Sequence, residues 1–221
     1  MKTNYWEKLE PEVIYHIYNR AVGKDNLFGD EDNYHYFLKQ WKAYLPYLEV
    51  YAYCLMPNHF HFLAKVKPIV GEQEIHLHKQ NTSKNKRFIK GEIPYSEFLE
   101  DQFKRLFSSY ALAYNKQQGR HGALFQKRFK RISVNKEYKL YELLAYIHHN
   151  PVHHHFCSAY EDWKYSSWSA YQNLQQPSLL NRQEVLNWFD ADTEKAMACF
   201  LSHHEEFRLD KRAGDEGLEE E

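Results

Sequence analysis

Two apolar, aromatic runs, residues 50–56 and 59–66, are separated only by Pro57 and Asn58. Their composition predicts two β-strands, and the Pro-Asn pair predicts a turn or kink between them. Successive side chains of a strand point to opposite faces, so His59 and His61 share one face while Phe60 points into a core. Two neighbouring imidazoles are potential ligands for a divalent metal. A His-x-His spacing also arises by chance in a chain with 14 His, so the pair alone does not establish a metal site.

The periodicity of the remaining chain predicts an α+β fold. We expect a ferredoxin-like or RRM-like antiparallel sheet with helices packed on one face, followed by a C-terminal helical appendage. The predicted strands are residues 13–18, 50–56, 59–66 and 130–134. The predicted helices are residues 30–44, 96–118, 136–150, 182–189 and 193–207.

Two parts are expected along the chain. Residues 1–175 would form the domain that carries the site, and residues 176–221 a helical appendage with an acidic, disordered tail. Pro151 is expected to stop the helix over 136–150, because proline cannot donate a helical hydrogen bond. Residues 68–94 are polar and basic with little periodicity, which predicts a long mobile loop.

Charge is distributed unevenly, although the formal net charge of the 221 residues is −1. Between Asp101 and Lys139 there are ten basic residues and two acidic ones, whereas residues 203–221 hold eight acidic and three basic ones. A basic patch on a near-neutral chain predicts contact with a polyanion, but it also fits a solvated helix face. The aromatic residues among these charges could belong to the core or stack on unpaired bases. They are Phe103, Phe107, Tyr110, Tyr114, Phe125 and Phe129.

Cysteine usage and hydropathy exclude several classes of protein. The three Cys form no CxxC motif, which argues against a zinc ribbon or a disulfide framework and fits a reducing cytoplasm. No run of about 18 apolar residues predicts a membrane span, and the N-terminus has no apolar signal-peptide core. We therefore expect a cytoplasmic protein with no membrane partner.

Tyr146 and Asn150 lie four residues apart in the predicted helix 136–150, so they share a face one turn apart. If that face packs across the two histidines, the imidazoles and the Asn150 oxygen can hold a cation that polarises a phosphate. Tyr146 can then supply a phenolic nucleophile. The simpler interpretation is that Tyr146 is one of 18 Tyr, on a half-buried helix. Tyr110 and Tyr114, on the basic helix, are rival nucleophiles.

Residues 53–63, YCLMPNHFHFL, resemble the signature of the HUH single-tyrosine transposases, in which two histidines flank a hydrophobic residue. The match is closest to the REP-associated tyrosine transposases, which are related to insertion-sequence transposases. Other segments agree in order, over roughly residues 13 to 171. They are YHIYNR (15–20) followed by LF (27–28), GALFQKRF (122–129), YIHHNPV (146–152) and WKYSSW (163–168).

The resemblance implies that His59 and His61 are metal ligands, that Asn150 is the third ligand, and that Tyr146 is the nucleophile. The implied metal is Mg²⁺ or Mn²⁺, although imidazole suits softer transition metals better. The implied reaction cleaves and rejoins single-stranded DNA that contains hairpins, through a 5′-phosphotyrosine, in a homodimer associated with the bacterial nucleoid. The residues expected to bind the DNA backbone are Arg20, Lys127, Arg128, Lys130 and Arg131.

Two alternatives remain open. A non-catalytic single-stranded nucleic-acid binding protein could use the same fold, but it would not need His59, His61 and Tyr146 together. The histidines that follow Tyr146 are expected to be exposed side chains after a helix end, with an additional metal site as the less favoured interpretation. They are His148, His149, His153, His154 and His155. The basic loop 71–91 is a candidate to become ordered on DNA.

Overall fold

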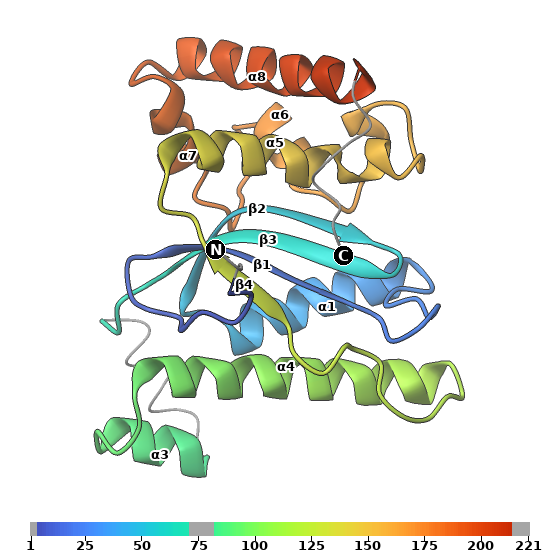
Figure 1. The fold of residues 1–221 in the computed structure, drawn as a ribbon, viewed down its shortest axis with the longest axis vertical. Coiled ribbons are helices and arrows are strands. Elements are labelled where there is room, and N and C mark those ends of the chain that lie inside the picture. The colour runs from blue at the N-terminus through green and yellow to red at the C-terminus, as the bar shows by residue number, and fades with distance from the viewer. Residues whose placement is uncertain (1–3, 71–81, 214–221) are drawn as a thin grey trace.

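The computed structural model describes residues 4–70 and 82–213, whose arrangement is drawn in Figure 1. Four strands form one antiparallel sheet in the order β2-β3-β1-β4. The predicted antiparallel α+β class is therefore confirmed. The strands are β1 (Ile14–Arg20), β2 (Leu48–Met56), β3 (His59–Val66) and β4 (Lys130–Ser133).

Pro57 and Asn58 connect β2 to β3 as a two-residue turn, as the sequence predicted. The Pro57 carbonyl accepts a hydrogen bond from the Leu27 N–H (2.7 Å), and the Asn58 carbonyl accepts one from the Ala21 N–H (2.8 Å). Buried carbonyls of a turn need such partners. These bonds tie the turn to the chain that leaves β1, and so they fix the position at which His59 enters the sheet.

One face of the sheet packs against α1 (Glu31–Tyr44) and α4 (Tyr95–Gln117), which lie below it in Figure 1. Phe60 and Phe62 point to this face, and the Phe62 ring stacks on Trp41 with 3.6 Å between centroids. Asp30 caps α1 by accepting a hydrogen bond from the Asn33 N–H at 3.0 Å.

The opposite face is covered by α5 (Glu137–His153), and α8 (Thr193–Ala213) packs on α5 as an outer layer. The expectation that the helices pack on one face only is corrected here. The reason is that β2 and β3 are apolar on both faces: Cys54, Met56 and Leu63 point away from α1 and are fully buried. A sheet that is apolar on both faces requires a helical layer on each.

Pro151 lies inside α5 and does not stop it, contrary to expectation. In the last turn of a helix a proline removes one hydrogen bond, and the remaining ladder can continue for a few residues. The helix ends where the His154 N–H donates to the Asn150 carbonyl at 3.0 Å and His155 adopts a left-handed φ of 58°.

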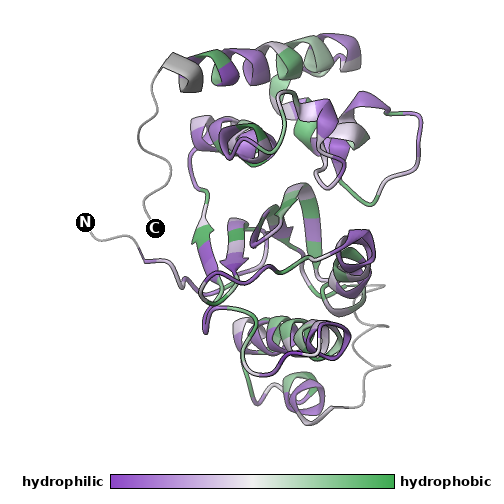
Figure 2. Ribbon diagram, turned by 90° about the vertical axis from the view of Figure 1, so that its right-hand side faces the viewer, coloured by the Kyte–Doolittle hydropathy of each residue, from purple (hydrophilic) through white to green (hydrophobic). Residues whose placement is uncertain are grey.

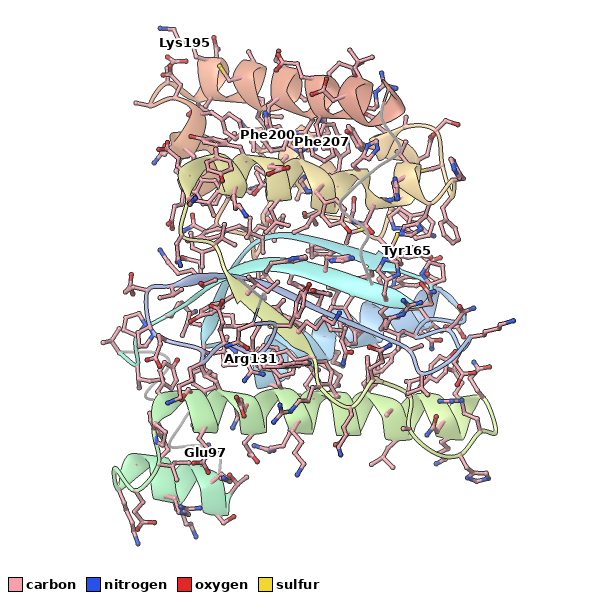
Figure 3. All side chains as sticks on the ribbon, in the orientation of Figure 1. Glu97, Arg131, Tyr165, Lys195, Phe200 and Phe207 are labelled. Atoms are coloured by element: carbon pink, nitrogen blue, oxygen red, sulfur yellow. The ribbon has the colours of Figure 1, made fainter. Side chains whose placement is uncertain are left out.

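The C-terminal segments are integrated with the sheet. After the 3₁₀ turn η1 (Tyr160–Asp162) come α6 (Trp168–Gln172) and α7 (Arg182–Phe189), so both predicted appendage helices, α7 and α8, are present. Val185 and Phe200 belong to the same buried cluster as Leu144 of α5 and Leu63 of β3. Figure 2 gives a side view of these layers, and Figure 3 places Phe200 and Phe207 between α8 and α5.

The predicted loop over 68–94 contains a short helix, α3 (Ser83–Ile89). Thr82 caps it by accepting a hydrogen bond from the Asn85 N–H at 3.2 Å. Residues 71–81 lie outside the described residues, and with them most of the segment that was expected to become ordered on DNA. No helix of the described ranges is both long enough and apolar enough to span a bilayer.

Candidate active site

The predicted site residues lie together where α5 crosses β3. His59 and His61 point to the α5 face of the sheet, as the alternation of strand side chains required. Their ring centroids are 5.1 Å apart. Tyr146 and Asn150 face them from α5: the Tyr146 ring is 5.6 Å from the His61 ring, and the Asn150 Oδ1 is 3.1 Å from the His59 Nε2.

The contact between His59 and Asn150 brings two acceptors together. The His59 Nδ1 lies 2.7 Å from the Asn58 Oδ1 and its Nε2 lies 3.1 Å from the Asn150 Oδ1, and a ring with one proton can donate to only one of these oxygens. The shorter contact favours the proton on Nδ1, which leaves a lone pair on Nε2. The Asn150 amide donates its Nδ2–H to the Tyr146 carbonyl at 3.3 Å, which directs its oxygen toward His59. Two ligand atoms of one octahedral Mg²⁺ lie about 3 Å apart. This donor pair therefore fits a divalent cation.

The ligand set is small. Among the described residues, no group of three or more His, Cys, Asp or Glu is arranged to hold a metal ion. A cation at this site would therefore depend on the two imidazoles and on the amide oxygen of Asn150, with its remaining positions open to phosphate oxygens and water. An open coordination sphere of this kind suits catalysis rather than a structural metal.

His16 of β1 is a member of the site that sequence reasoning did not identify. Its Nε2 lies 2.9 Å from the His61 Nδ1. His16 and Tyr18 lie two residues apart on β1, so their side chains share one face of the sheet. The sequence alone does not show that β1 pairs with β3 in the register that sets Tyr18 opposite His61, and this register places His16 on the same face as His61. Burial lowers the pKa of His16 to about 3 and holds the pKa of His61 well below its ordinary value. Both rings are therefore neutral at physiological pH, as a metal ligand must be.

The rival tyrosines lie on the other side of the sheet. Tyr110 is 1% exposed and donates its hydroxyl hydrogen to the Leu27 carbonyl at 2.6 Å. Burial raises its pKa further above the ordinary value, which opposes formation of a phenolate. Tyr114 belongs to the same buried cluster. Tyr146, in contrast, is half-buried and stands nearly perpendicular to the rings of His61 and His16, at 80° and 86°.

Four of the five predicted DNA-contacting cations lie where DNA could reach them. Lys127, Arg128 and Arg20 are exposed, and Arg20 pairs with His59 across the strands. Lys130 pairs with Tyr18 on the site face, and its ammonium lies 5.5 Å from the Tyr18 ring centroid.

Arg131 is placed differently. It pairs with Ile17, so its side chain points to the opposite face from that of Lys130. There it is 7% exposed, forms an ion pair with Glu100 of α4, and donates from Nε to the Glu7 carbonyl at 2.6 Å. Figure 3 shows it between β4 and α4. The expectation that it contacts DNA is corrected: its guanidinium is used within the protein.

For two members of the second histidine group, His148 and His149, the expectation of exposed side chains is wrong, whereas His155 is exposed and His153 and His154 are half-buried. His148 and His149 are 1% and 4% exposed rather than solvated. The His148 Nε2 lies 2.7 Å from the Ser167 Oγ, and its Nδ1 lies 2.9 Å from the Nε2 of His204 on α8. Local sequence patterns could not predict this contact, because His204 lies 56 residues further along the chain.

No protein-family model matches the chain. A protein of Haemophilus influenzae named as a REP-associated tyrosine transposase is 27% identical over 131 residues, which cover 58% of this chain and 63% of the relative. The chain thus spans less than two thirds of that curated relative. A solved structure of a REP-associated tyrosine transposase bound to a REP hairpin has a similar fold, with a TM-score of 0.51 and 14% identity, over 80% of this chain and 89% of the other. The chain is thus similar in sequence to one REP-associated tyrosine transposase and similar in fold to another.

Proposed function

We propose that this protein is a metal-dependent strand transferase that cleaves and rejoins single-stranded DNA containing hairpins, with Tyr146 as its nucleophile. The main support is the convergence of His59, His61 and Asn150 beside Tyr146 on one face of the sheet. The hairpin bound to the solved relative supports the substrate class. The exposed cations around β4 add a surface that suits a phosphate backbone.

The chemistry follows from these positions. His59 and His61 through Nε2, and Asn150 through Oδ1, would hold Mg²⁺ or Mn²⁺, which when bound polarises a phosphate oxygen and offsets charge in the transition state. The Tyr146 hydroxyl loses its proton and attacks phosphorus. The bond to the 3′-oxygen breaks, and that oxygen takes up a proton. The product is a 5′-phosphotyrosine.

A second 3′-hydroxyl then attacks the phosphotyrosine and releases Tyr146, which joins new DNA ends. The phosphodiester is exchanged for a phosphotyrosine ester and back, so the reaction consumes no nucleotide. The resemblance further suggests that the chain acts as a homodimer on nucleoid DNA. Light scattering tests the dimer, because a monomer has a mass of 26.8 kDa.

The decisive experiment incubates the protein with labelled hairpin DNA and Mn²⁺ and measures covalent adduct and cleavage. Tyr146→Phe is expected to abolish both while retaining hairpin binding. Tyr138→Phe is the matched control, because Tyr138 lies on the same helix and is 58% exposed, and it should react like the wild type. Cleavage that persists in Tyr146→Phe would refute the assignment. Hairpin binding without an adduct in the wild type would favour the non-catalytic alternative.

A further inference from the structure

We propose that His16 is a positioning residue for the metal site, because it accepts a hydrogen bond from His61 and so holds that ring in its metal-binding tautomer. This inference rests on the proposed function, which requires His61 as a ligand. Nothing in the motifs or in the comparisons gives His16 a role. Its place in the sheet does: it lies on β1, beside β3, on the face that α5 covers.

The distance between the two rings decides which atom His61 can offer. The His61 Nδ1 lies 2.9 Å from the His16 Nε2, so this nitrogen is occupied and only Nε2 remains as a ligand. A neutral imidazole carries one proton, so a ligating Nε2 requires the proton on Nδ1. The hydrogen bond must therefore run from His61 to His16. In the opposite direction the proton of His61 would lie on Nε2 and would block the metal.

His16 is well suited to this task. Its ring stacks on Tyr18 with 4.5 Å between centroids and lies 5.1 Å from the His61 ring, which limits its rotation. A lysine or arginine at this position could not accept a hydrogen bond, and an aliphatic side chain could neither accept nor stack. A side chain with an acceptor at this distance favours the tautomer that leaves the His61 Nε2 available.

Asn58 orients His59, the other proposed metal ligand, in the same way. Its Oδ1 lies 2.7 Å from the His59 Nδ1 and selects the tautomer whose Nε2 points toward Asn150. Both histidines thus present Nε2 to the metal. The acceptor that faces Nδ1 is Asn58 of the turn for His59 and His16 of β1 for His61. Removing such a partner of a metal-binding histidine costs about 10- to 100-fold in metal affinity.

The test measures Mn²⁺ affinity of the full chain by calorimetry, which does not depend on DNA cleavage. His16→Phe keeps a ring to stack on Tyr18 but removes the acceptor, and it should weaken binding about 10- to 100-fold. His16→Gln retains an acceptor oxygen and should restore most of the affinity. His35→Phe, a histidine on α1 whose side chain is 65% exposed, is the control and should bind as the wild type does. Nitrogen NMR of the metal-free protein reports which ring nitrogen of His61 carries the proton. In His16→Phe, the fraction of His61 with its proton on Nδ1 should be lower than in the wild type.

His59→Ala separates the inference from the proposed function. If the wild type does not bind Mn²⁺, or if His59→Ala binds it equally well, the metal centre itself fails and the role of His16 fails with it. If His59→Ala loses Mn²⁺ but His16→Phe keeps the wild-type affinity, the role of His16 is overturned and the proposed function stands. Weaker binding in His16→Phe, with recovery in His16→Gln, supports both.

Discussion

Lys130 and Arg131 are adjacent cations on β4 whose side chains have opposite tasks. Lys130 lies on the site face, and Arg131 is buried against α4. Lys130→Ala should reduce the salt dependence of hairpin binding by about one phosphate contact, a change of about 0.7–0.9 in the slope of log affinity against log salt. Arg131→Ala should leave that slope unchanged but lower the free energy of unfolding by about 1–3 kcal/mol, because it removes a buried side chain with its ion pair and hydrogen bond. Equal slopes in Lys130→Ala and the wild type would contradict this assignment.

For single residues, the sequence predicted which side chains of a strand share a face, but not which residues of neighbouring strands lie opposite each other. The shared face of His59 and His61 follows from strand alternation alone. The same rule places Lys130 and Arg131 on opposite faces, but which face is buried depends on α4, which the alternation does not reveal. The role of His16 needs the register of β1 against β3, a long-range property that local patterns do not encode.

Among the elements, α5 is joined to α8 and to Ser167 by a buried chain of hydrogen bonds, and the donor of each bond can be assigned. The His204 Nδ1–H donates to the Phe200 carbonyl at 2.8 Å, so its Nε2 accepts from the His148 Nδ1–H, and the His148 Nε2 accepts from the Ser167 hydroxyl. His204→Leu leaves the buried His148 donor unsatisfied and should cost about 1–3 kcal/mol in urea unfolding. His204→Gln offers an acceptor and should lose less. Equal losses in the two variants would mean that packing, not the hydrogen bond, is what matters.

The same chain makes stability depend on pH. Burial lowers the pKa of His204 to about 3, whereas an unfolded histidine titrates near 6.5. Below pH 6.5 the unfolded state binds the proton and the native state does not, so the free energy of unfolding falls as the pH falls toward 3. Above about pH 7 neither state is protonated at His204, and its full contribution to stability is present. The contribution is about 1.4 kcal/mol per pH unit. The titratable side chains that interact with the ring are His148, His149, His203 and Tyr160, whereas Glu161 and Glu205 line the cavity beside it.

His204→Gln removes this titration. Urea unfolding between pH 6 and pH 4 should show a slope of stability against pH that is smaller by about one proton than that of the wild type. The His35→Phe control changes an exposed histidine on the other side of the sheet and should keep the wild-type slope. If His204→Gln and the wild type have the same slope, His204 is already charged in the native state, and the assigned direction of the hydrogen bonds is incorrect.

At the scale of the whole molecule, the order of the elements was predictable and their layering was not. Hydrophobic periodicity located the ends of every strand and long helix to within three residues, except that α8 continues six residues beyond the predicted end at residue 207. The continuous apolar runs of β2 and β3 indicate that both faces of the sheet are buried, but they do not show that α5 is the helix that covers the second face. This layering makes the division of the chain at residue 175 testable.

Residues 176–213, the described part of the predicted appendage, complete the core instead of extending it. Val185, Leu186, Ala196 and Phe200 are at most 1% exposed, in the cluster that also contains Leu144 and Ile147 of α5. A chain ending at residue 175 would expose the outer side of α5 and leave His148 without His204. Burying each large apolar side chain contributes about 1.5–3 kcal/mol, so the loss of several is comparable to the net stability of a typical domain, about 5–15 kcal/mol.

We therefore expect residues 1–175 alone to aggregate or to lack a cooperative thermal transition in circular dichroism, and to be unable to bind hairpin DNA. The matched control is a chain ending at residue 213, which keeps α7 and α8 and removes only the acidic end. It should unfold as cooperatively as the full chain. A monomeric, cooperatively folding 1–175 fragment that forms the Tyr146 adduct would contradict this expectation. It would mean that the sheet and α5 hold the site geometry without the layer above them.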